Sequence, residues 1–283
     1  MSLRVTPFDA PLGAEISGLD LTRAVDEPTL ETVKQALRDH HVIVFRDQKI
    51  TPEPQIAFSR RFGPLQIHVL AQFLLPGHPE ILVVSNVIED GKPIGLGDAG
   101  RYWHSDLSYK PVPSLGSLLH ARELPPEGGN TLFANLHRAY DLLPDATKKR
   151  LEGARARHDY QKRHDALRKE TGVRPELTEA QKAQVQGAVH PVVRTHPESG
   201  RKALFVSEGF STRILDWDEA DSDAMLSDLF ARSVVPENIY RHVWRPHDMV
   251  FWDNRSVVHL ATPVPAGMRR TMYRTTVEGD VPA

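Results

Sequence analysis

The residues best suited to chemistry lie in the stretch YWHSDLSY (102–109), where His104 and Asp106 are two positions apart. Side chains two apart in an extended chain point to the same face, so this imidazole and this carboxylate can converge on one point. They could form a hydrogen-bonded pair in the core, or both could bind a third group. The second interpretation requires another ligand from a distant part of the chain.

A second imidazole would complete the set of two histidines and one carboxylate that binds Fe(II) and leaves three coordination positions open on one face. Five other histidines fit simpler roles. His40 and His41 lie at a helix–strand junction and are expected to be solvated, His120 is expected to be a core residue of an apolar strand, and His190 and His196 lie at hairpin ends. His259 lies in the apolar segment FWDNRSVVHLATP and is followed by two arginines. We therefore predict that His104, Asp106 and His259 are the metal ligands.

The arginines after His259 predict what else the site binds. A 2-oxo acid chelated by iron would leave its far carboxylate in a dry cavity, and a buried carboxylate needs a charge-assisted partner. Arg270 follows His259 by 270 − 259 = 11 residues, which suits a strand–turn–strand connection. Strand parity puts Arg270, Met272 and Arg274 on one face and Arg269 on the other. We expect Arg269 at the surface and the other two arginines inside, where they need two anions.

The composition is that of an ordinary globular chain. The 283 residues are 40% hydrophobic and 25% charged, which is enough for a sizeable core. A net charge of -2 and a pI near 6.7 provide no basic field for nucleic acid or an anionic membrane. The N-terminal segment lacks a signal-peptide pattern, and no apolar run approaches the roughly 18 residues of a membrane span. The absence of cysteine excludes disulfides and thiolate sites and favours a cytoplasmic location.

The pattern of elements predicts one mainly β domain with helices, covering residues 1–283. Periodicity predicts helices over 27–40, 177–188 and 218–234, the last capped by Asp216 or Asp218, and strands over 41–47, 79–87 and 114–124. Another strand begins near Thr131, a hairpin spans 190–207, and four strands follow residue 238. Because helices are grouped rather than alternating with strands, we expect a β-sandwich or barrel with helical insertions. The segment GLGDAG (95–100) lacks the setting of a phosphate loop and is expected to be mobile.

Six further blocks follow one another in order along nearly the whole chain: WHSD (103–106), LPPEGGNTLFAN (124–135), HDYQKRH (158–164), HPVVRTHPESGRKALFVSEGFSTRI (190–214), WDNRSVVH (252–259) and RRTMYRTTVEGD (269–280). On these blocks the chain resembles the TauD/TfdA family of Fe(II)- and 2-oxoglutarate-dependent dioxygenases. This resemblance implies a double-stranded β-helix, or jelly-roll core, with helices packed outside. It also implies dimers or tetramers, which are common in the family.

The resemblance also implies an activity and a role for each site residue. Members hydroxylate a small organic acid with O2 while 2-oxoglutarate is decarboxylated to succinate and CO2. By the resemblance, His104, Asp106 and His259 bind Fe(II), and Thr131 and Arg270 bind the far carboxylate of 2-oxoglutarate. The remaining roles concern the organic acid and the pocket wall: Arg274 and His68 face the anionic head, Tyr160 and Phe210 are aromatic contacts, and Trp252 lines the iron pocket.

The substrate is expected to be a small anionic acid other than taurine. Gly100 replaces an asparagine that taurine dioxygenases place near the substrate amine, and Ala71 replaces a tyrosine, so polar contacts are lost and the pocket is expected to be larger. This favours a sulfonate, a sulfate ester or a phenoxyalkanoate, with release of sulfite, sulfate or phenol. Three alternatives remain: taurine dioxygenase itself, a zinc hydrolase, and a non-catalytic jelly-roll binding protein. Segments 88–101 and 161–180 are predicted to act as lids.

Overall fold

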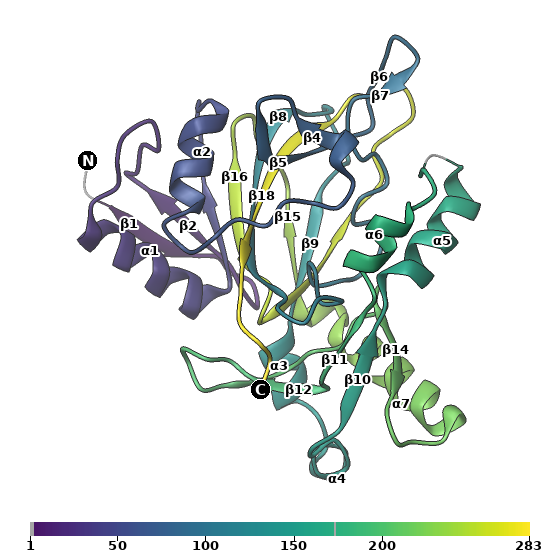
Figure 1. Ribbon diagram of the computed structural model, residues 1–283. Helices are drawn as coiled ribbons and strands as arrows, with labels where there is room; N and C mark the ends of the chain where they lie inside the picture. The colour runs from purple at the N-terminus through teal and green to yellow at the C-terminus, as the bar shows by residue number, and fades with distance from the viewer. Residues whose placement is uncertain (1–2, 173) are drawn as a thin grey trace.

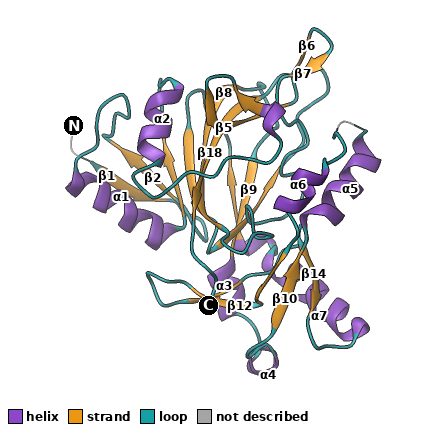
Figure 2. Cartoon of the chain, viewed as in Figure 1, coloured by secondary structure: helices purple, strands orange, loops and turns teal. Residues whose placement is uncertain are grey.

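The computed structural model describes residues 3–172 and 174–283, with strands at its centre and helices around them (Figures 1 and 2). The largest sheet has eight strands, and all of its neighbouring strands are antiparallel except the parallel pair β2 and β3. Its order is β1 (Arg4–Pro7), β2 (Ala14–Ser17), β3 (Val42–Phe45), β16 (Met249–Asp253), β8 (Ser114–Glu123), β18 (Thr271–Glu278), β5 (His78–Ser85) and β4 (Leu74–Leu75).

A second, antiparallel sheet faces the first across the core. It consists of β15 (Ile239–His242), β9 (Thr131–Asn135) and β17 (Val257–Ala261). Three smaller sheets complete the strands of the described residues: β11 (Ala188–Pro191), β10 (Arg155–His158) and β14 (Ser211–Ile214); the hairpin β12 (Val193–Thr195) and β13 (Lys202–Leu204); and the hairpin β6 (Ile88–Glu89) and β7 (Lys92–Pro93).

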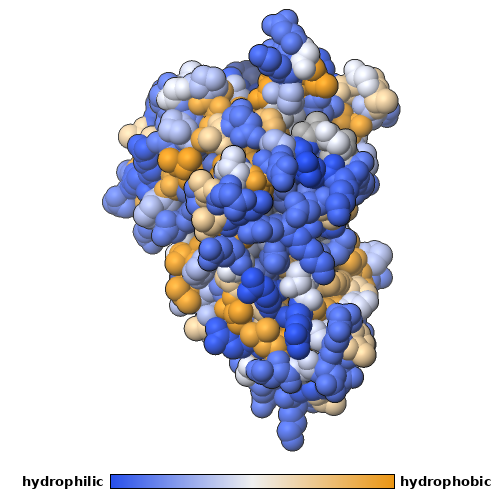
Figure 3. All heavy atoms as spheres, turned by 45° about the vertical axis from the view of Figure 1, so that its right-hand side comes forward, coloured by the Kyte–Doolittle hydropathy of each residue, from blue (hydrophilic) through white to orange (hydrophobic). Residues whose placement is uncertain are grey.

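Helices cover the outer faces of the two sheets. The α-helices are α1 (Glu27–His40), α2 (Pro52–Ser59), α3 (Leu136–Asp141), α4 (Asp145–Arg150), α5 (Tyr160–Thr171), α6 (Glu179–Gln184) and α7 (Glu219–Ser233), with 3₁₀ turns at Ala71–Phe73 and Pro236–Asn238. Helices α1 and α2 lie on one side of the large sheet, and α5 and α6 lie on the opposite side of the molecule (Figure 1). On the face drawn in Figure 3, hydrophobic residues appear in small groups among hydrophilic ones. In the described part of the chain, no helix has the length and apolar character needed to cross a membrane.

Strand alternation sorts the side chains of the large sheet into two cores. On β16, Met249 and Phe251 pack with the helices, whereas Val250 and Trp252 point between the two sheets. In the second sheet, Phe133 of β9 points into the same central core. The central core therefore lies between the two sheets. A polar side chain that points into it is shielded from water.

Helix α1 shows how local sequence sets an element. Asp26 caps it by accepting a hydrogen bond from the Thr29 backbone N–H at 2.9 Å. The helix ends where His41 adopts φ 65°, and β3 begins at the next residue. The predicted helix over 27–40 is thus confirmed, but the expectation that His41 is solvated is wrong, because β3 enters the core at once and leaves His41 only 4% exposed.

Other sequence expectations hold with adjusted bounds. The predicted strands at 79–87 and 114–124 are β5 and β8, and the predicted hairpin around 198–200 joins β12 to β13. The helix predicted over 177–188 is shorter, as α6, and begins with a capping box formed by Thr178 and Gln181. The segment 95–100, expected to be mobile, is anchored in the structure, because Leu96 and Asp98 are buried.

Buried histidines give the fold a predictable sensitivity to acid. The rings of His41 and His137 lie 5.0 Å apart, and burial lowers the pKa of His41 to about 3 and that of His137 to about 4, from an ordinary 6.5. Below pH 6.5 these two histidines bind protons in the unfolded chain but stay neutral in the folded chain. The free energy of unfolding is therefore undiminished above pH 6.5 and falls as the pH drops toward the folded-state pKa values of about 4 and 3. Each histidine should cost about 2 kcal/mol of unfolding free energy at pH 5.

Urea unfolding at pH 7.5 and pH 5 measures this loss. The His137→Asn variant should show a shallower fall between the two pH values, because its side chain no longer titrates. An equal fall in wild type and variant would contradict the assignment.

Candidate active site

The structure brings three side chains that are distant in sequence to one point of the central core. His104 and His259 pair as an isolated antiparallel bridge, with backbone hydrogen bonds of 3.1 and 2.8 Å in the two directions. Their rings lie 4.1 Å apart. The Nε2 atoms of His104 and His259 lie 3.6 and 3.7 Å from the two carboxylate oxygens of Asp106. All three side chains are buried, and their ligand atoms lie within 4.8 Å of one another, which suits a single metal ion.

Protonation in this triad also suits a metal. The Nδ1 atom of His104 lies 2.9 Å from the Tyr102 carbonyl oxygen, to which it donates a hydrogen bond, and its Nε2 faces Asp106. Burial, followed by the neighbouring His104, lowers the pKa of His259 well below its ordinary value. Burial alone would raise the pKa of Asp106, but Arg274, His259 and His104 outweigh it and hold that pKa well below the ordinary range. The triad therefore offers two imidazoles and one ionised carboxylate.

Arg274 lies against the triad. Its Nη1 donates a hydrogen bond of 2.8 Å to Asp106 Oδ1, while its Nε is buried without a hydrogen-bond partner. Strand β18 also carries Met272 into the central core, as parity predicts. Arg269, on the other face, is half-exposed and pairs with Glu89 and Glu123.

One cavity beside the triad contains a buried cation without a counter-ion. We call it the Thr131–Arg270 cavity; its lining also includes Trp252, His259 and Arg274. Arg270 is 6% exposed, its Nε and Nη2 have no hydrogen-bond partner among the described residues, and burial lowers its pKa to about 10. The Thr131 hydroxyl accepts a hydrogen bond of 3.1 Å from Trp244 Nε1, so its own proton remains available. A dry guanidinium and a free hydroxyl donor make a site for a carboxylate.

A second cavity on the other side of the triad is walled by aromatic rings. We call it the aromatic cavity; it is lined by His68, Tyr102, Tyr109, Tyr160, Phe210, Arg174 and Arg274, with Gly100, His104 and Asp106 at its base. Phe210 lies among the tyrosines, with centroid distances of 5.1 Å to Tyr109, 5.7 Å to Tyr102 and 6.2 Å to Tyr160. Such a wall suits an apolar or aromatic ligand body.

All nine side chains predicted for the site line one of the two cavities: His68, His104, Asp106, Thr131, Tyr160, Phe210, His259, Arg270 and Arg274. Gly100 also lies beside His104, as expected. Its φ is +72°, and a Cβ there would come within 3.3 Å of His104 Cε1. The expectation for Ala71 is wrong: its side chain is exposed and does not line either cavity. Trp252 packs on His259 with a centroid distance of 4.7 Å.

Several residues of the site are not among those predicted from the sequence. Tyr102 and Tyr109 lie in the quoted stretch around His104, where the interleaved aromatics were the available signal. No sequence pattern pointed to Arg174. In the structure its Nε donates a hydrogen bond of 2.7 Å to the buried Asp98, and it also contacts Tyr160. This ion pair joins the two segments predicted as lids, and it is neutral overall.

Comparisons with known proteins agree with this geometry. The family model described as Taurine catabolism dioxygenase TauD, TfdA family matches residues 4–276. Pentalenolactone F synthase from Streptomyces arenae is 35% identical over 99% of this chain and 97% of its own length. The (S)-phenoxypropionate/alpha-ketoglutarate-dioxygenase of Sphingobium herbicidovorans is 34% identical over 98% and 95%. The crystal structure of AAD-2 in complex with Mn(II) and N-oxalylglycine has a TM-score of 0.82 and 32% identity, covering 100% of this chain and 99% of that one.

The fold, the triad and the unpaired arginine therefore define an Fe(II)- and 2-oxoglutarate-dependent dioxygenase. The chain belongs to the TauD/TfdA family. The zinc-hydrolase and non-catalytic alternatives are set aside by this family assignment.

Proposed function

We propose that this enzyme hydroxylates a monoanionic organic acid with a bulky, hydrophobic body, of the phenoxyalkanoate, sulfate ester or sulfonate class. In this proposal, His104, Asp106 and His259 bind Fe(II). Thr131 and Arg270 bind the far carboxylate of 2-oxoglutarate. The organic acid occupies the aromatic cavity, whose residues His68, Tyr160, Phe210 and Arg274 hold it.

The balance of buried charge supports a single negative charge on the acid. Arg270 and Arg274 bring two positive charges and Asp106 one negative charge. A ferrous ion adds two, for a total of +3. The 2-oxoglutarate dianion and one monoanionic acid bring this sum to zero. The Arg174–Asp98 pair adds nothing, since its charges cancel.

The lining of the aromatic cavity supports a substrate without an amine. Asp106 is the only acidic side chain among the described residues that line it. Burial, aided by Arg274, lowers the pKa of His68 to about 3, so His68 is neutral. Its Nδ1 accepts a hydrogen bond of 3.2 Å from the Leu70 N–H, which leaves the Nε2 proton to donate. An ammonium group would therefore find, among the described lining residues, only an acidic partner that already pairs with Arg274, whereas an anionic head would meet donors.

The names of relatives support the class without fixing one substrate. At 34–35% identity, one relative is a phenoxypropionate dioxygenase and another a pentalenolactone F synthase. Since similar identities accompany such different names, the choice among acids depends on the aromatic cavity itself.

In this mechanism the chain's own residues bind, orient and exclude water. When bound, Fe(II) supplies the redox chemistry, in which O2 is used and 2-oxoglutarate becomes succinate and CO2. Arg270 and Thr131 fix the far end of 2-oxoglutarate and so determine its direction. Arg274, with a free Nε beside the triad, grips the anionic head of the acid, and the aromatic rings keep its body dry.

A substrate panel tests the proposal. Succinate formation should be measured with phenoxyalkanoates, alkyl sulfates, alkyl and aryl sulfonates, and taurine. At least one bulky acid should exceed taurine in kcat/KM by about 10-fold or more, the range that one unmatched pocket contact produces. A clear preference for taurine would overturn the substrate assignment and restore the taurine dioxygenase alternative.

We also propose the fold type, the domain extent, the oligomeric state and the location of the protein. Two facing sheets with helices outside support a double-stranded β-helix core, and we propose one domain over residues 1–283. A homodimer or homotetramer and a cytoplasmic location are proposed from the family resemblance and the lack of cysteine. Nucleic acid and membranes are not proposed as partners.

A further inference from the structure

The turn between β16 and β17 contains a buried amide whose hydrogen-bonding capacity is fully used. Asn254 is 1% exposed. Its Oδ1 accepts hydrogen bonds from the Asp106 backbone N–H at 3.1 Å and from Trp252 Nε1 at 3.0 Å. Its Nδ2 donates to Ser114 Oγ at 3.0 Å and to Ser117 Oγ at 3.3 Å.

These contacts require an amide. The Ser117 hydroxyl donates its proton to Asp106 Oδ2 at 2.7 Å, and the Ser114 hydroxyl donates to backbone carbonyl oxygens. Both hydroxyls can therefore only accept from Asn254, and a carboxylate at position 254 would have no proton to give them.

Three groups around the triad depend on this amide. Asn254 fixes the backbone of Asp106, supports the hydroxyl of Ser117 that bonds to its carboxylate, and holds the indole of Trp252 against His259. The backbone carbonyl of Asn254 also accepts a 2.6 Å hydrogen bond from Ser105. The orientation of the Asp106 carboxylate is thus set from several directions at once.

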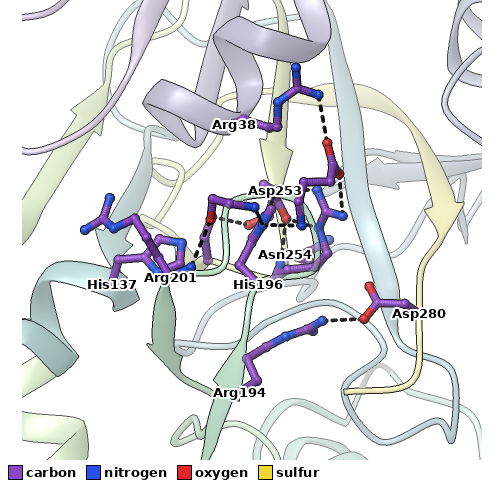
Figure 4. Close-up of polar contacts among 12 residues, drawn as sticks. Arg38, His137, Arg194, His196, Arg201, Asp253, Asn254 and Asp280 are labelled. Atoms are coloured by element: carbon purple, nitrogen blue, oxygen red, sulfur yellow. Dashed lines mark hydrogen bonds and ion pairs between the residues drawn. The ribbon is translucent and has the colours of Figure 1, made fainter. Parts of the chain in front are cut away.

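The turn is also anchored by a network of ion pairs, in which Asp253, Arg255 and His196 are buried (Figure 4). Asp253 accepts hydrogen bonds from Arg255 at 2.7 and 2.8 Å and lies 3.0 Å from His196 Nε2. Glu198 pairs with Arg255 at 2.7 Å and with Arg38 of α1 at 2.9 Å. A turn bound in this way cannot shift without breaking several charged contacts, so Asn254 has a fixed support.

We propose that Asn254, acting through Ser117, is a positioning residue that holds the Asp106 carboxylate in the orientation that binds the metal ion. The inference rests on the proposed role of Asp106 as a ligand. Outer-shell groups of this kind orient metal ligands, and their loss typically weakens metal affinity or activity by roughly 10- to 100-fold.

Mn(II) affinity, measured by electron paramagnetic resonance without substrate, tests the proposal apart from turnover. Ser117→Ala removes one hydroxyl and should weaken Mn(II) binding by about 10-fold, with little change in the Tm of the metal-free protein. Asn254→Ala should weaken it at least as much. In the double variant the two effects should not add, because both act on the same carboxylate. Ser233→Ala removes a buried hydroxyl that bonds within α7 and serves as the matched control.

The outcomes separate this inference from the proposed function. Wild-type Mn(II) affinity in Ser117→Ala overturns the positioning role, even where Asn254→Ala does not fold. If Asp106→Ala also retains wild-type affinity, the proposed ligand set itself is wrong. If Asp106→Ala alone loses the metal, only the positioning role fails.

Discussion

Replacing Asp106 with alanine is expected to abolish turnover and to weaken Mn(II) binding by more than the roughly 10- to 100-fold typical of losing an outer-shell group. The physical reason is that Asp106 is the one carboxylate among the three ligand side chains, and its low pKa keeps it ionised. The variant should still fold, with a lower Tm, because Arg274 loses its partner. Succinate formation, metal titration and thermal unfolding measure the three effects.

Asp248→Ala is the matched control for this variant. Asp248 is equally buried and pairs with Arg46 and His242, but it does not line either cavity. Its loss should lower the Tm while the folded protein keeps its Mn(II) affinity. If both variants lost metal to the same extent, general destabilisation would explain the result and the ligand assignment would not survive.

Replacing Arg270 with methionine is expected to raise the KM for 2-oxoglutarate by about 30-fold or more, with little change in the KM for the organic acid. Removing one partner of a buried charged pair costs about 2–5 kcal/mol, and each 1.4 kcal/mol corresponds to a tenfold change. Because Arg270 is buried with its Nε and Nη2 unpaired in the described part of the chain, the Tm of the variant, measured without added ligand, should not fall.

Arg274→Met should show the opposite pattern, with the larger KM change for the organic acid. Arg269→Met is the control, since Arg269 lies on the outer face of the same segment and pairs with surface glutamates. Steady-state kinetics in each substrate separates the cases. If the KM changes were exchanged between the two inner variants, the two anion sites would have been assigned in reverse.

Part of this structure was predictable from the sequence by local physical rules. The helix over 27–40 was predictable because its apolar period and its Asp26 cap are local signals. The inward direction of Met272 and Arg274 followed from strand parity, which needs no knowledge of neighbouring strands. The pairing of His104 with a distant His259 was reached through residue types, an arginine spacing and a family resemblance.

Other features depended on contacts that no local pattern encodes. His41 is buried because β3 enters the core immediately after α1. Ala71 lies outside the cavity because the chain there forms a surface 3₁₀ turn. Arg174 reaches Asp98 across 76 residues of sequence. None of these results from periodicity, since each depends on where a segment folds against another.

The sequence by itself determined which side chains are available: two imidazoles and a carboxylate for a metal, two inward arginines for two anions, and no thiol. Only the tertiary structure decided that Arg270 lies buried with its Nε and Nη2 unpaired among the described residues, that Arg274 bonds to Asp106, and that Asn254 bonds to the Asp106 backbone and to Ser117. The reason is physical: strand direction is fixed by neighbouring residues, whereas burial, and with it charge and proton position, is fixed by the packing of distant segments.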